Sequence, residues 1–345
     1  MRLSHGTGAL RRTGAVGIGV VLAASVLVGG GGAVASSGHG SGHGPGPVGG
    51  HGRCTTAVAA GTHQVPVTFG GARYDVRVHV PAGVRSPALV LDLHGSGADG
   101  AAQSAISGLD ALGDEKGFVA VEPDGAIPLN GGWAWNVPGV PTTAGQMPPA
   151  DARDDVAFLG AVIDQVGRVV CADDRRVYAT GYSGGGRMAS ALACRLSDRL
   201  AAVGTVAGLR AGRPSPLDTS VPDVADCTPT RAVPVVEFHG DADYTNPYQG
   251  SSDLRWGYTV PVAVQTWARL DGCRVGPTTT VVSEHVTRYA YSRCSSGADV
   301  QLYRVAGGGH TWPGTSVDQS SNGTVTQEIS ASRILWDFFA AHPRR

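Results

Sequence analysis

Residues 181–185 hold a serine between glycines, in a pattern typical of a nucleophilic serine. The segment reads Gly181-Tyr182-Ser183-Gly184-Gly185 and directly follows residues 176–180, a strand-like run. In such a G-x-S-x-G turn, the serine has a strained backbone between a strand and a helix, and a Cβ on the flanking glycines would clash. Because the chain contains 52 glycines, this motif alone is weak evidence, and partners for the serine must be found.

A serine hydroxyl needs a base within hydrogen-bond reach and a third group that orients the base. Two later segments supply candidates: Asp243 ends the strand-like residues 235–243, and His310 ends residues 302–310. The order Ser, Asp, His is that of the α/β-hydrolases and differs from the chymotrypsin and subtilisin orders. We therefore predict a serine hydrolase with Ser183 as nucleophile, His310 as general base and then acid, and Asp243 as orienting carboxylate.

Each proposed partner of the serine has a rival nearby. Asp241 competes with Asp243 as the acid, and spacing alone does not separate them. His239 competes with His310 as the base, but it ends a strand two residues before Asp241, which favours a structural role. From the residues alone, both aspartates remain candidates for the acid.

The oxyanion of a tetrahedral intermediate needs two backbone N–H groups aimed at it. We expect one from Gly184, which follows the nucleophile, and the other from the loop that begins at His94 after an apolar run. Within that loop we favour Ser96, with Gly95 and Gly97 as alternatives. His94 immediately precedes the turn glycine, so we expect it to brace the loop rather than to act in catalysis.

Four aromatic residues near these segments are candidate substrate contacts. Trp312 lies two residues after His310, so we expect it to line the rim of the site. Trp133 and Trp135 lie in a glycine-rich stretch, and Tyr182 precedes the nucleophile. Large amphipathic rings are suited to hold an aromatic acyl group, a sugar or a polyester chain, although loop packing explains Trp133 and Trp135 equally well.

Strand-like and helix-like segments alternate along most of the chain. Residues 88–93 and 118–122 are nearly continuous apolar runs, as expected of parallel strands buried on both faces. Residues 74–80 alternate in polarity, as an antiparallel edge strand does. Helical patterns follow at residues 154–163, 184–196 and 327–341. This alternation predicts an α/β fold with one domain, whose mostly parallel central sheet carries helices on both faces.

The N-terminus has the features of a secretion signal. Early arginines precede the apolar residues 15–28, and Ala33-Val34-Ala35 forms an A-x-A cleavage site. We predict a signal peptide over residues 1–35, a disordered Gly/His/Ser-rich linker over 36–53 and an α/β-hydrolase catalytic domain over 54–345. The apolar run is short for a membrane span, so we expect a secreted protein without a span after processing. An uncleaved anchor is the alternative.

The chain has 345 residues, of which 42% are hydrophobic and 16% charged, as in globular proteins. The net charge of −1 gives no indication of nucleic acid or an anionic membrane as partner. No C-x-x-C motif occurs, and we expect no metal, no cofactor and a monomer whose partner is its ester substrate.

Six cysteines suit an exported protein with up to three disulfides, for which 15 connectivities exist. Cys273 and Cys294 flank one strand-rich segment of the chain, so a bridge between them would close a local loop. The remaining pairs are then Cys194–Cys227 and Cys54–Cys171. Buried free thiols are the alternative.

The ordered motifs resemble the secreted polyhydroxybutyrate depolymerase-like family, which merges in sequence with the feruloyl esterases of carbohydrate-esterase family one. The resemblance runs from about Phe69 to the end of the chain. The matching segments are residues 91–95, 154–159, 176–183, 185–186, 188–189, 239–240 with Asp243, and 309–314. The family pattern H-G-x-x-D implies Asp243 rather than Asp241 as the acid. The pattern G-H-x-W-P-G implies His310 as the base.

The chain departs from the family pattern at two positions. Gly184 stands where many members have Asn or Ala, but it still supplies a backbone N–H. Arg187 stands where many members have Met or another uncharged residue. This arginine either changes the polarity of the acyl pocket or points to solvent.

The resemblance implies an ester hydrolase that acts outside the cell without a cofactor. Similar proteins cleave feruloyl or p-coumaroyl esters of cell-wall sugars, acetyl groups of xylan, or hydroxyalkanoate oligomers. We favour a phenolic or acyl ester of plant cell-wall polysaccharide, because an aromatic rim suits it and no polyester-adsorbing domain is visible. Hydrolysis of hydroxyalkanoate oligomers is the runner-up, ahead of a secreted peptidase or a non-catalytic surface-binding protein on the same scaffold.

Overall fold

Strands and helices alternate in the computed structural model, which describes residues 58–345. The strands are β1 (Gly61–Phe69), β2 (Ala72–Val80), β3 (Ala88–Leu93), β4 (Phe118–Glu122), β5 (Ile127–Leu129), β6 (Gly132–Ala134), β7 (Val177–Tyr182), β8 (Ala202–Val206), β9 (Val235–Gly240), β10 (Val275–Val281), β11 (Val286–Ser292) and β12 (Val300–Val305). The α-helices are α1 (Gly100–Ser107), α2 (Leu109–Lys116), α3 (Asp155–Val170), α4 (Gly184–Arg195), α5 (Val260–Leu270) and α6 (Ala331–Ala341). The predicted signal peptide and linker lie outside the described residues.

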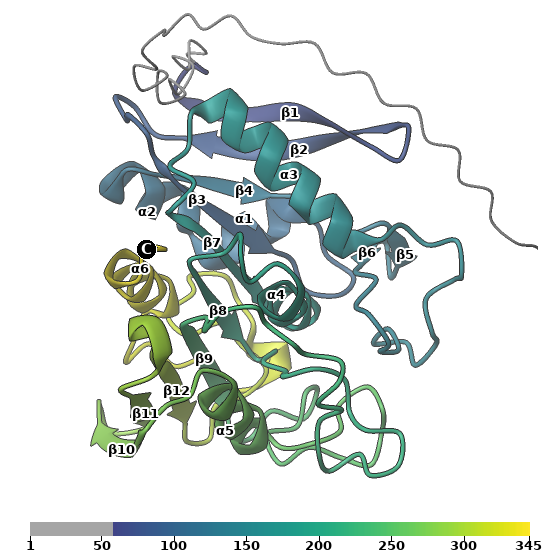
Figure 1. Cartoon of the computed structure of the whole chain (residues 1–345), viewed down its shortest axis with the longest axis vertical. Helices are drawn as coiled ribbons and strands as arrows, with labels where there is room; N and C mark the ends of the chain where they lie inside the picture. The colour runs from purple at the N-terminus through teal and green to yellow at the C-terminus, as the bar shows by residue number, and fades with distance from the viewer. Residues whose placement is uncertain (1–57) are drawn as a thin grey trace, which may run out of the picture. The chain divides into compact units, whose positions relative to one another are not determined.

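Ten of the strands form one sheet, in the order β1-β2-β4-β3-β7-β8-β9-β12-β11-β10 (Figure 1). The six central strands, from β4 to β12 in this order, run parallel to one another, whereas β4 pairs antiparallel with β2 and β12 pairs antiparallel with β11. The antiparallel pairs β1–β2 and β10–β11 extend the two edges. Strands β5 and β6 form a separate hairpin. The predicted mostly parallel central sheet is therefore confirmed.

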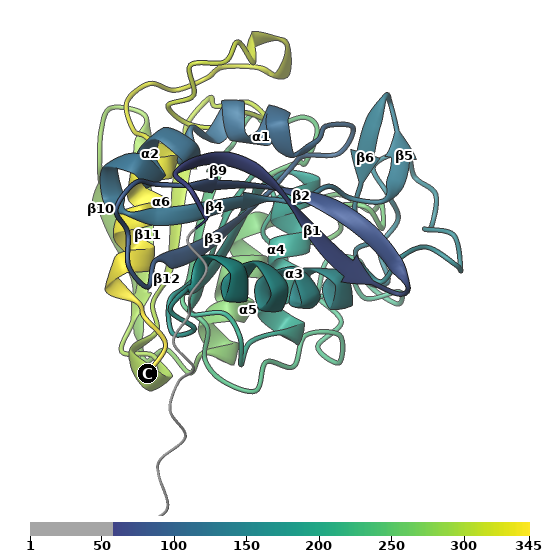
Figure 2. The ribbon, with the colours of Figure 1, turned by 90° about the horizontal axis from the view of Figure 1, so that it is seen from above.

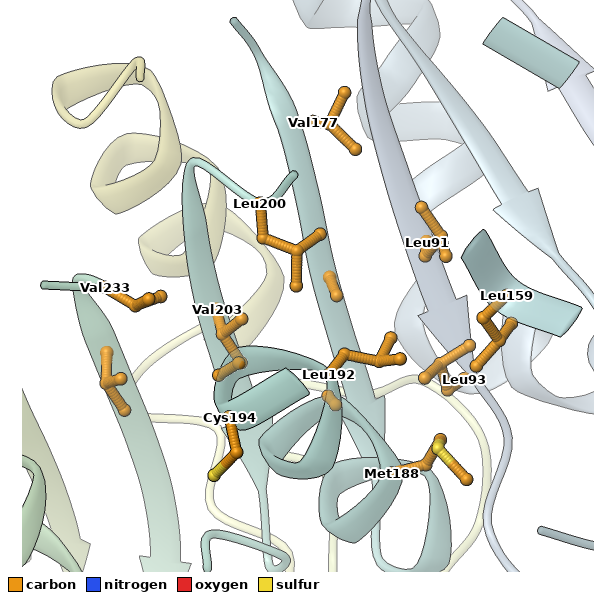
Figure 3. Close-up of a cluster of buried hydrophobic side chains, with 14 of the residues drawn as sticks. Leu91, Leu93, Leu159, Val177, Met188, Leu192, Cys194, Leu200, Val203 and Val233 are labelled. Atoms are coloured by element: carbon orange, nitrogen blue, oxygen red, sulfur yellow. The ribbon is translucent and has the colours of Figure 1, made fainter. Parts of the chain in front are cut away.

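Helices cover both faces of this sheet (Figure 2). Helices α3, α4 and α5 contribute to one buried apolar cluster, and α2 and α6 contribute to the other. Strand β3 has every residue buried, as expected of a strand with helices on both sides. Figure 3 shows Leu91 and Leu93 of this strand near Leu159 of α3 and Met188 and Leu192 of α4. This packing fixes α4, which begins at the predicted nucleophile, against the middle of the sheet.

One prediction about the sheet is wrong. Strand β2 was expected at an edge because its residues alternate in polarity, but β1 pairs along its whole length from Ala72 to Val80. The alternation arises because β1 and β2 have one face on the core and the other towards solvent, which does not require an edge position.

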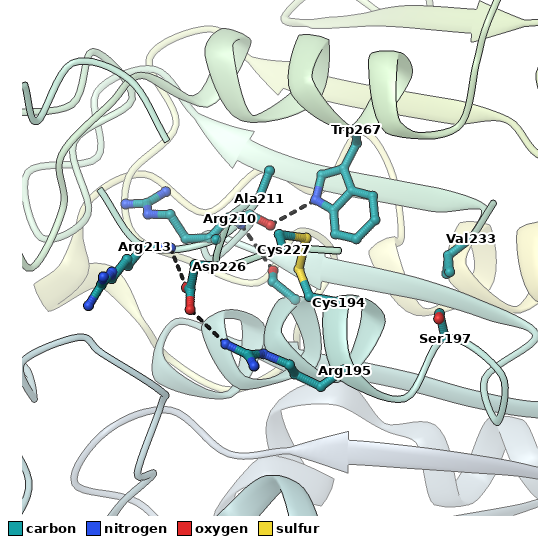
Figure 4. The surroundings of a disulfide bond; sticks show 12 residues. Cys194, Arg195, Ser197, Arg210, Ala211, Arg213, Asp226, Cys227, Val233 and Trp267 are labelled. Carbon is teal, nitrogen blue, oxygen red and sulfur yellow. Dashed lines mark hydrogen bonds and ion pairs between the residues drawn. A yellow bond between two sulfur atoms is a disulfide. The ribbon is translucent and has the colours of Figure 1, made fainter. Parts of the chain in front are cut away.

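Two of the three predicted disulfides lie within the described residues, and both are confirmed. Cys194 of α4 bonds to Cys227 (Figure 4), and Cys273 bonds to Cys294 across the hairpin β10–β11. Cys54 lies outside the described residues, so its pairing with Cys171 stays a prediction. Across residues 58–345, no helix combines the length and the apolar character that a bilayer span requires.

Candidate active site

Ser183 lies in the turn between β7 and α4 with an unusual backbone conformation. Its φ of 55° and ψ of −115° fall outside the regions that side chains other than glycine favour. The turn is held because Ser183 N donates to Val206 O at 2.8 Å and Arg187 N donates to Ser183 O at 3.0 Å. The strained serine that the G-x-S-x-G pattern predicts is therefore present.

The glycines on either side of Ser183 are required by close packing. A Cβ on Gly185 would stand 1.9 Å from Leu93 O, and a Cβ on Gly181 would stand 2.5 Å from the carbonyl carbon of Gly185. Both separations are far below any van der Waals contact. Larger residues at these positions would push α4 away from the end of β3 and remove the turn.

His310 and Asp243 lie together after the ends of β12 and β9. His310 Nδ1 is 2.7 Å from Asp243 Oδ2, and both residues are about 5% exposed. A carboxylate only accepts hydrogen bonds, so Nδ1 carries the proton and Nε2 is left as the acceptor. The Tyr182 hydroxyl donates to His310 O at 2.5 Å, which brings the imidazole next to the nucleophile turn.

Within residues 58–345, no hydrogen bond joins Ser183 Oγ to His310. Catalytic hydrogen bonds are often long in enzymes without substrate and tighten only in the complex. His310 nevertheless lies next to the serine turn, because Tyr182, the residue before Ser183, packs against the His310 ring with a centroid separation of 5.0 Å.

Asp241, the alternative candidate for the acid, contacts other partners than His310. Its carboxylate accepts from Gly307 N at 2.7 Å and from Arg304 Nε at 2.9 Å. The Asp243 carboxylate instead accepts from Thr245 N and Asn246 N, each at 2.8 Å, with its other oxygen. Asp241 therefore holds the start of the loop after β12, and Asp243 is the one in contact with the imidazole.

His239 lies behind Asp243 in a fully buried position. Its Nδ1 is 2.7 Å from Glu237 Oε1, and its Nε2 is 2.9 Å from Asn246 O and 3.4 Å from Asp243 Oδ2. All these partners are acceptors, so both ring nitrogens donate and the ring is an imidazolium. Burial opposes this charge, but the hydrogen bonds and charges of Asp243 and Glu237 outweigh it and raise the pKa of His239 to about 9.

The same contacts act on Asp243. Burial disfavours its charged form, but the hydrogen bonds from His239 and His310 outweigh this and hold the pKa of the carboxyl well below its usual range. The acid is therefore ionised at neutral pH, and it is positioned from both sides.

Sequence reasoning missed two buried residues beside this network, Asn246 and Arg210. Asn246 Oδ1 accepts from Arg210 Nη2 at 2.7 Å, and its Nδ2 donates to Ala207 O at 2.6 Å. The guanidinium of Arg210 also interacts electrostatically with the carboxylates of Glu237 and Asp243. Neither residue belongs to a recognisable motif, because their roles depend on neighbours far away in the sequence.

The loop after β3 lies against the start of α4. A Cβ on Gly184 would stand 2.4 Å from Ser96 Oγ and 3.2 Å from Ser96 N. In the described part of the chain, neither the Gly184 N–H nor the Ser96 N–H donates to an acceptor, whereas Gly97 N donates to Trp133 O at 2.8 Å. The N–H groups of Gly184 and Ser96, which are adjacent and free beside the serine, are suited to bind an oxyanion. The N–H of Gly97 is excluded as an oxyanion donor, because it is already hydrogen-bonded to Trp133 O.

His94 braces this loop, as predicted. Its Nδ1 donates to Gly95 O at 2.8 Å, and its Nε2 accepts from Gly125 N at 2.9 Å. Burial lowers the pKa of His94, so the ring is neutral, in agreement with one donating and one accepting nitrogen. The ring also packs on Trp135, at a centroid separation of 4.8 Å.

The predicted rim position of Trp312 is wrong. The side chain is 1% exposed, donates from Nε1 to Ser332 Oγ at 3.0 Å and packs in the core with α6. Trp135 is also buried, with its Nε1 donating to His94 O at 2.9 Å. Tyr182 is buried beneath His310. Of the four aromatic candidates only Trp133 is exposed, at 37%.

No family model matches the chain. It is 29% identical over 296 residues to a protein named for esterase activity, NocK of Nocardia uniformis subsp. tsuyamanensis, with 79% of this chain and 80% of NocK covered. It is 30% identical over 187 residues to feruloyl esterase B of Piromyces equi, which covers 52% of this chain but only 31% of that enzyme. The solved acetyl xylan esterase from Aspergillus awamori matches with a TM-score of 0.55 at 17% identity, over 73% of this chain and 94% of that one.

The relatives are esterases, and this chain is an ester hydrolase with the α/β-hydrolase fold. The predicted resemblance to feruloyl esterases is confirmed by relatives that carry this name. The structural match at this low identity supports the fold. Among residues 58–345 of this esterase, no group of three or more His, Cys, Asp or Glu residues is arranged to hold a metal ion.

The protonation of His239 predicts how the stability of this esterase depends on pH. A group whose pKa rises on folding stabilises the folded state fully below its ordinary pKa, here 6.5, and this contribution is lost as the pH rises through about 9. We expect the wild-type free energy of unfolding to fall over this range, measured by urea denaturation. His239→Gln should lack that part of the slope, and an unchanged slope in the variant would contradict the assignment.

The separate contacts of the two aspartates predict opposite results for two isosteric substitutions. Asp243→Asn should lower kcat on the order of 10⁴-fold, because an amide favours the wrong tautomer of His310. Asp241→Asn, which only weakens the contact with Arg304, should cost far less. Steady-state kinetics on 4-nitrophenyl acetate measures both variants, and the reverse order of effects would transfer the acid role to Asp241.

Proposed function

We propose that this esterase hydrolyses carboxylic esters through Ser183, His310 and Asp243, with an acyl-enzyme intermediate. The observation that carries this proposal is the 2.7 Å hydrogen bond between His310 Nδ1 and Asp243 Oδ2, beside a strained serine turn. The bond keeps the proton on Nδ1 and leaves Nε2 able to take the proton of Ser183. All three residues follow the carboxyl ends of parallel strands, where open α/β sheets form their sites.

The reaction then proceeds in two halves. Ser183 Oγ attacks the ester carbonyl while His310 Nε2 takes its proton, and the negative oxygen is held by the N–H groups of Gly184 and Ser96. The intermediate collapses to an acyl-serine, and the alcohol leaves with the proton from His310. Water attacks the acyl-serine in the same way, with His310 as base, and releases the acid.

The positive end of the α4 dipole also stabilises the negative oxygen that forms when Ser183 attacks the ester. Helix α4 begins at Gly184, so its first unpaired N–H groups lie beside the nucleophile. This end of a helix carries roughly half a positive charge and stabilises negative charge nearby. The oxyanion forms at this end.

For the substrate, we propose feruloyl or other acyl esters of plant polysaccharide. The proposal is supported by relatives named feruloyl esterase and acetylxylan esterase. It is also supported by Trp133, whose backbone pairs with Gly97 and Ala98, directly after Ser96. An exposed indole at this position offers a flat surface to a phenolic or sugar ring.

We also propose that the esterase is exported and loses residues 1–35. The confirmed disulfides Cys194–Cys227 and Cys273–Cys294 support this, because such bonds persist in oxidising compartments.

A substrate panel tests the proposed function. Methyl ferulate, acetylated xylan, hydroxybutyrate oligomers and 4-nitrophenyl acetate are assayed with wild type and Ser183→Ala. We expect the highest kcat/KM on methyl ferulate or acetylated xylan, and a loss on the order of 10⁴-fold or more in the variant, because no other nucleophile replaces the serine.

Ser197→Ala is the matched control, since it removes another buried hydroxyl, beyond the far end of α4, and should keep activity near that of wild type. A preference for hydroxybutyrate oligomers would instead assign a polyester substrate. If Ser183→Ala retains wild-type activity on every ester, the proposed mechanism is wrong.

A further inference from the structure

Arg187 is a buried cation without an acidic partner in the described part of the chain. Its side chain is 4% exposed, yet its hydrogen bond goes to a backbone carbonyl, from Nη2 to Pro141 O at 3.3 Å. Its guanidinium also lies over the Trp256 ring, 5.4 Å from the centroid. Burial lowers the pKa of Arg187 to about 9, and the charge of Arg210 adds to this effect. The side chain remains cationic at neutral pH.

The other charges in this region are already balanced. Arg210 faces the network in which the carboxylates of Glu237 and Asp243 enclose one imidazolium, so that two positive and two negative groups are buried together. Asp253 acts on Arg187 through its charge, but its carboxylate is bound by Arg255 at 2.6 and 2.9 Å. Arg187 is therefore the uncompensated charge, and burial of such a group is costly.

A narrow pocket lies between α4 and the loops around residues 137–141 and 210–214, and Arg187 lines it together with Arg210. Its single acidic lining residue, Asp226, accepts from Arg195 Nη2 and Arg213 N at 2.7 and 2.8 Å. Figure 4 shows these contacts next to Arg210. The Nε of Arg210 is buried without a hydrogen-bond partner among the described residues. The pocket therefore has excess positive charge and an unused donor.

The position of Arg187 relates this pocket to the nucleophile. Arg187 N bonds to Ser183 O, so the two residues are one helical turn apart, which is about 6 Å along the axis. Side chains on a helix lean towards its N-terminus, which here is the end that carries Ser183. Of the α4 residues that line the pocket, Arg187 is therefore the one nearest to Ser183.

We propose that Arg187 binds a carboxylate carried by the substrate, so that the preferred esters have a free acid group near the ester. This inference rests on the serine mechanism proposed above and specifies the substrate class of the same site. A planar guanidinium in an apolar surrounding binds a carboxylate strongly, because two parallel hydrogen bonds form with charge on both partners. The carboxylate supplies the missing negative charge.

Paired esters that differ in charge test this proposal. On the acyl side, the mono-4-nitrophenyl ester of glutaric acid is compared with 4-nitrophenyl valerate. On the alcohol side, 3-butyryloxybutanoic acid is compared with its methyl ester. We expect wild type to prefer the acidic member of at least one pair in kcat/KM, and the pair that responds identifies the side of the ester that carries the acid. Added NaCl should weaken this preference.

Arg187→Met keeps most of the apolar stem and removes the charge. The ratio of kcat/KM for the acidic over the neutral ester should fall about 10- to 100-fold, as expected for hydrogen bonds to a charged group. Arg199→Gln is the matched control, because Arg199 is a partly exposed arginine that pairs with Asp164 and does not line this pocket. This control should keep the wild-type ratio, and thermal melting monitors the folding of both variants.

Two results would overturn the carboxylate site: equal wild-type rates on both members of each pair, or an unchanged ratio in Arg187→Met. If Arg187→Met does not fold, the wild-type preference and its salt dependence decide alone. Ser183-dependent hydrolysis of the neutral esters without any charge preference would leave the esterase mechanism intact and remove only this inference. Hydrolysis of all esters by Ser183→Ala would contradict the mechanism and the inference together.

Discussion

The candidate active site of this esterase depends on how closely the first turn of α4 packs against the end of β3. Only glycine fits at position 185, because a Cβ there would stand 1.9 Å from Leu93 O. With the helix this close, the connecting residue Ser183 has a positive φ and begins the helix at the carboxyl edge of the sheet. The loops after β3, β9 and β12 end at the same edge, and they carry Ser96, Asp243 and His310.

A second layer of buried charge supports this edge. The imidazolium of His239 lies between Glu237 and Asp243, and it orients the carboxylate that contacts His310. Charged groups in a low dielectric interact strongly, so the network is stable only while every member keeps its partner. Arg187 is the exception, because it is buried without an acidic partner among the described residues, and a substrate carboxylate would complete the charge balance.

Much of the fold followed from the sequence, because buried parallel strands and the glycine turn have local signatures. Position along the chain did not predict side-chain direction, however. Trp312 is two residues from His310, yet it points into the core towards Ser332. The residue spacing left Asp241 and Asp243 unresolved, since their partners Arg304 and His310 lie more than 60 residues away. The protonated state of His239 likewise depends on acceptors that only the folded chain brings together.

Covalent labelling of the nucleophile tests the central claim most directly. The protein is treated with a fluorophosphonate, which phosphonylates activated serines with loss of fluoride, and the modified peptide is identified by mass spectrometry. We expect one phosphonyl group per chain on Ser183, with strongly reduced labelling in Asp243→Asn because His310 is then held in the wrong tautomer. Labelling at another serine, or none in a folded and active preparation, would contradict the proposed triad.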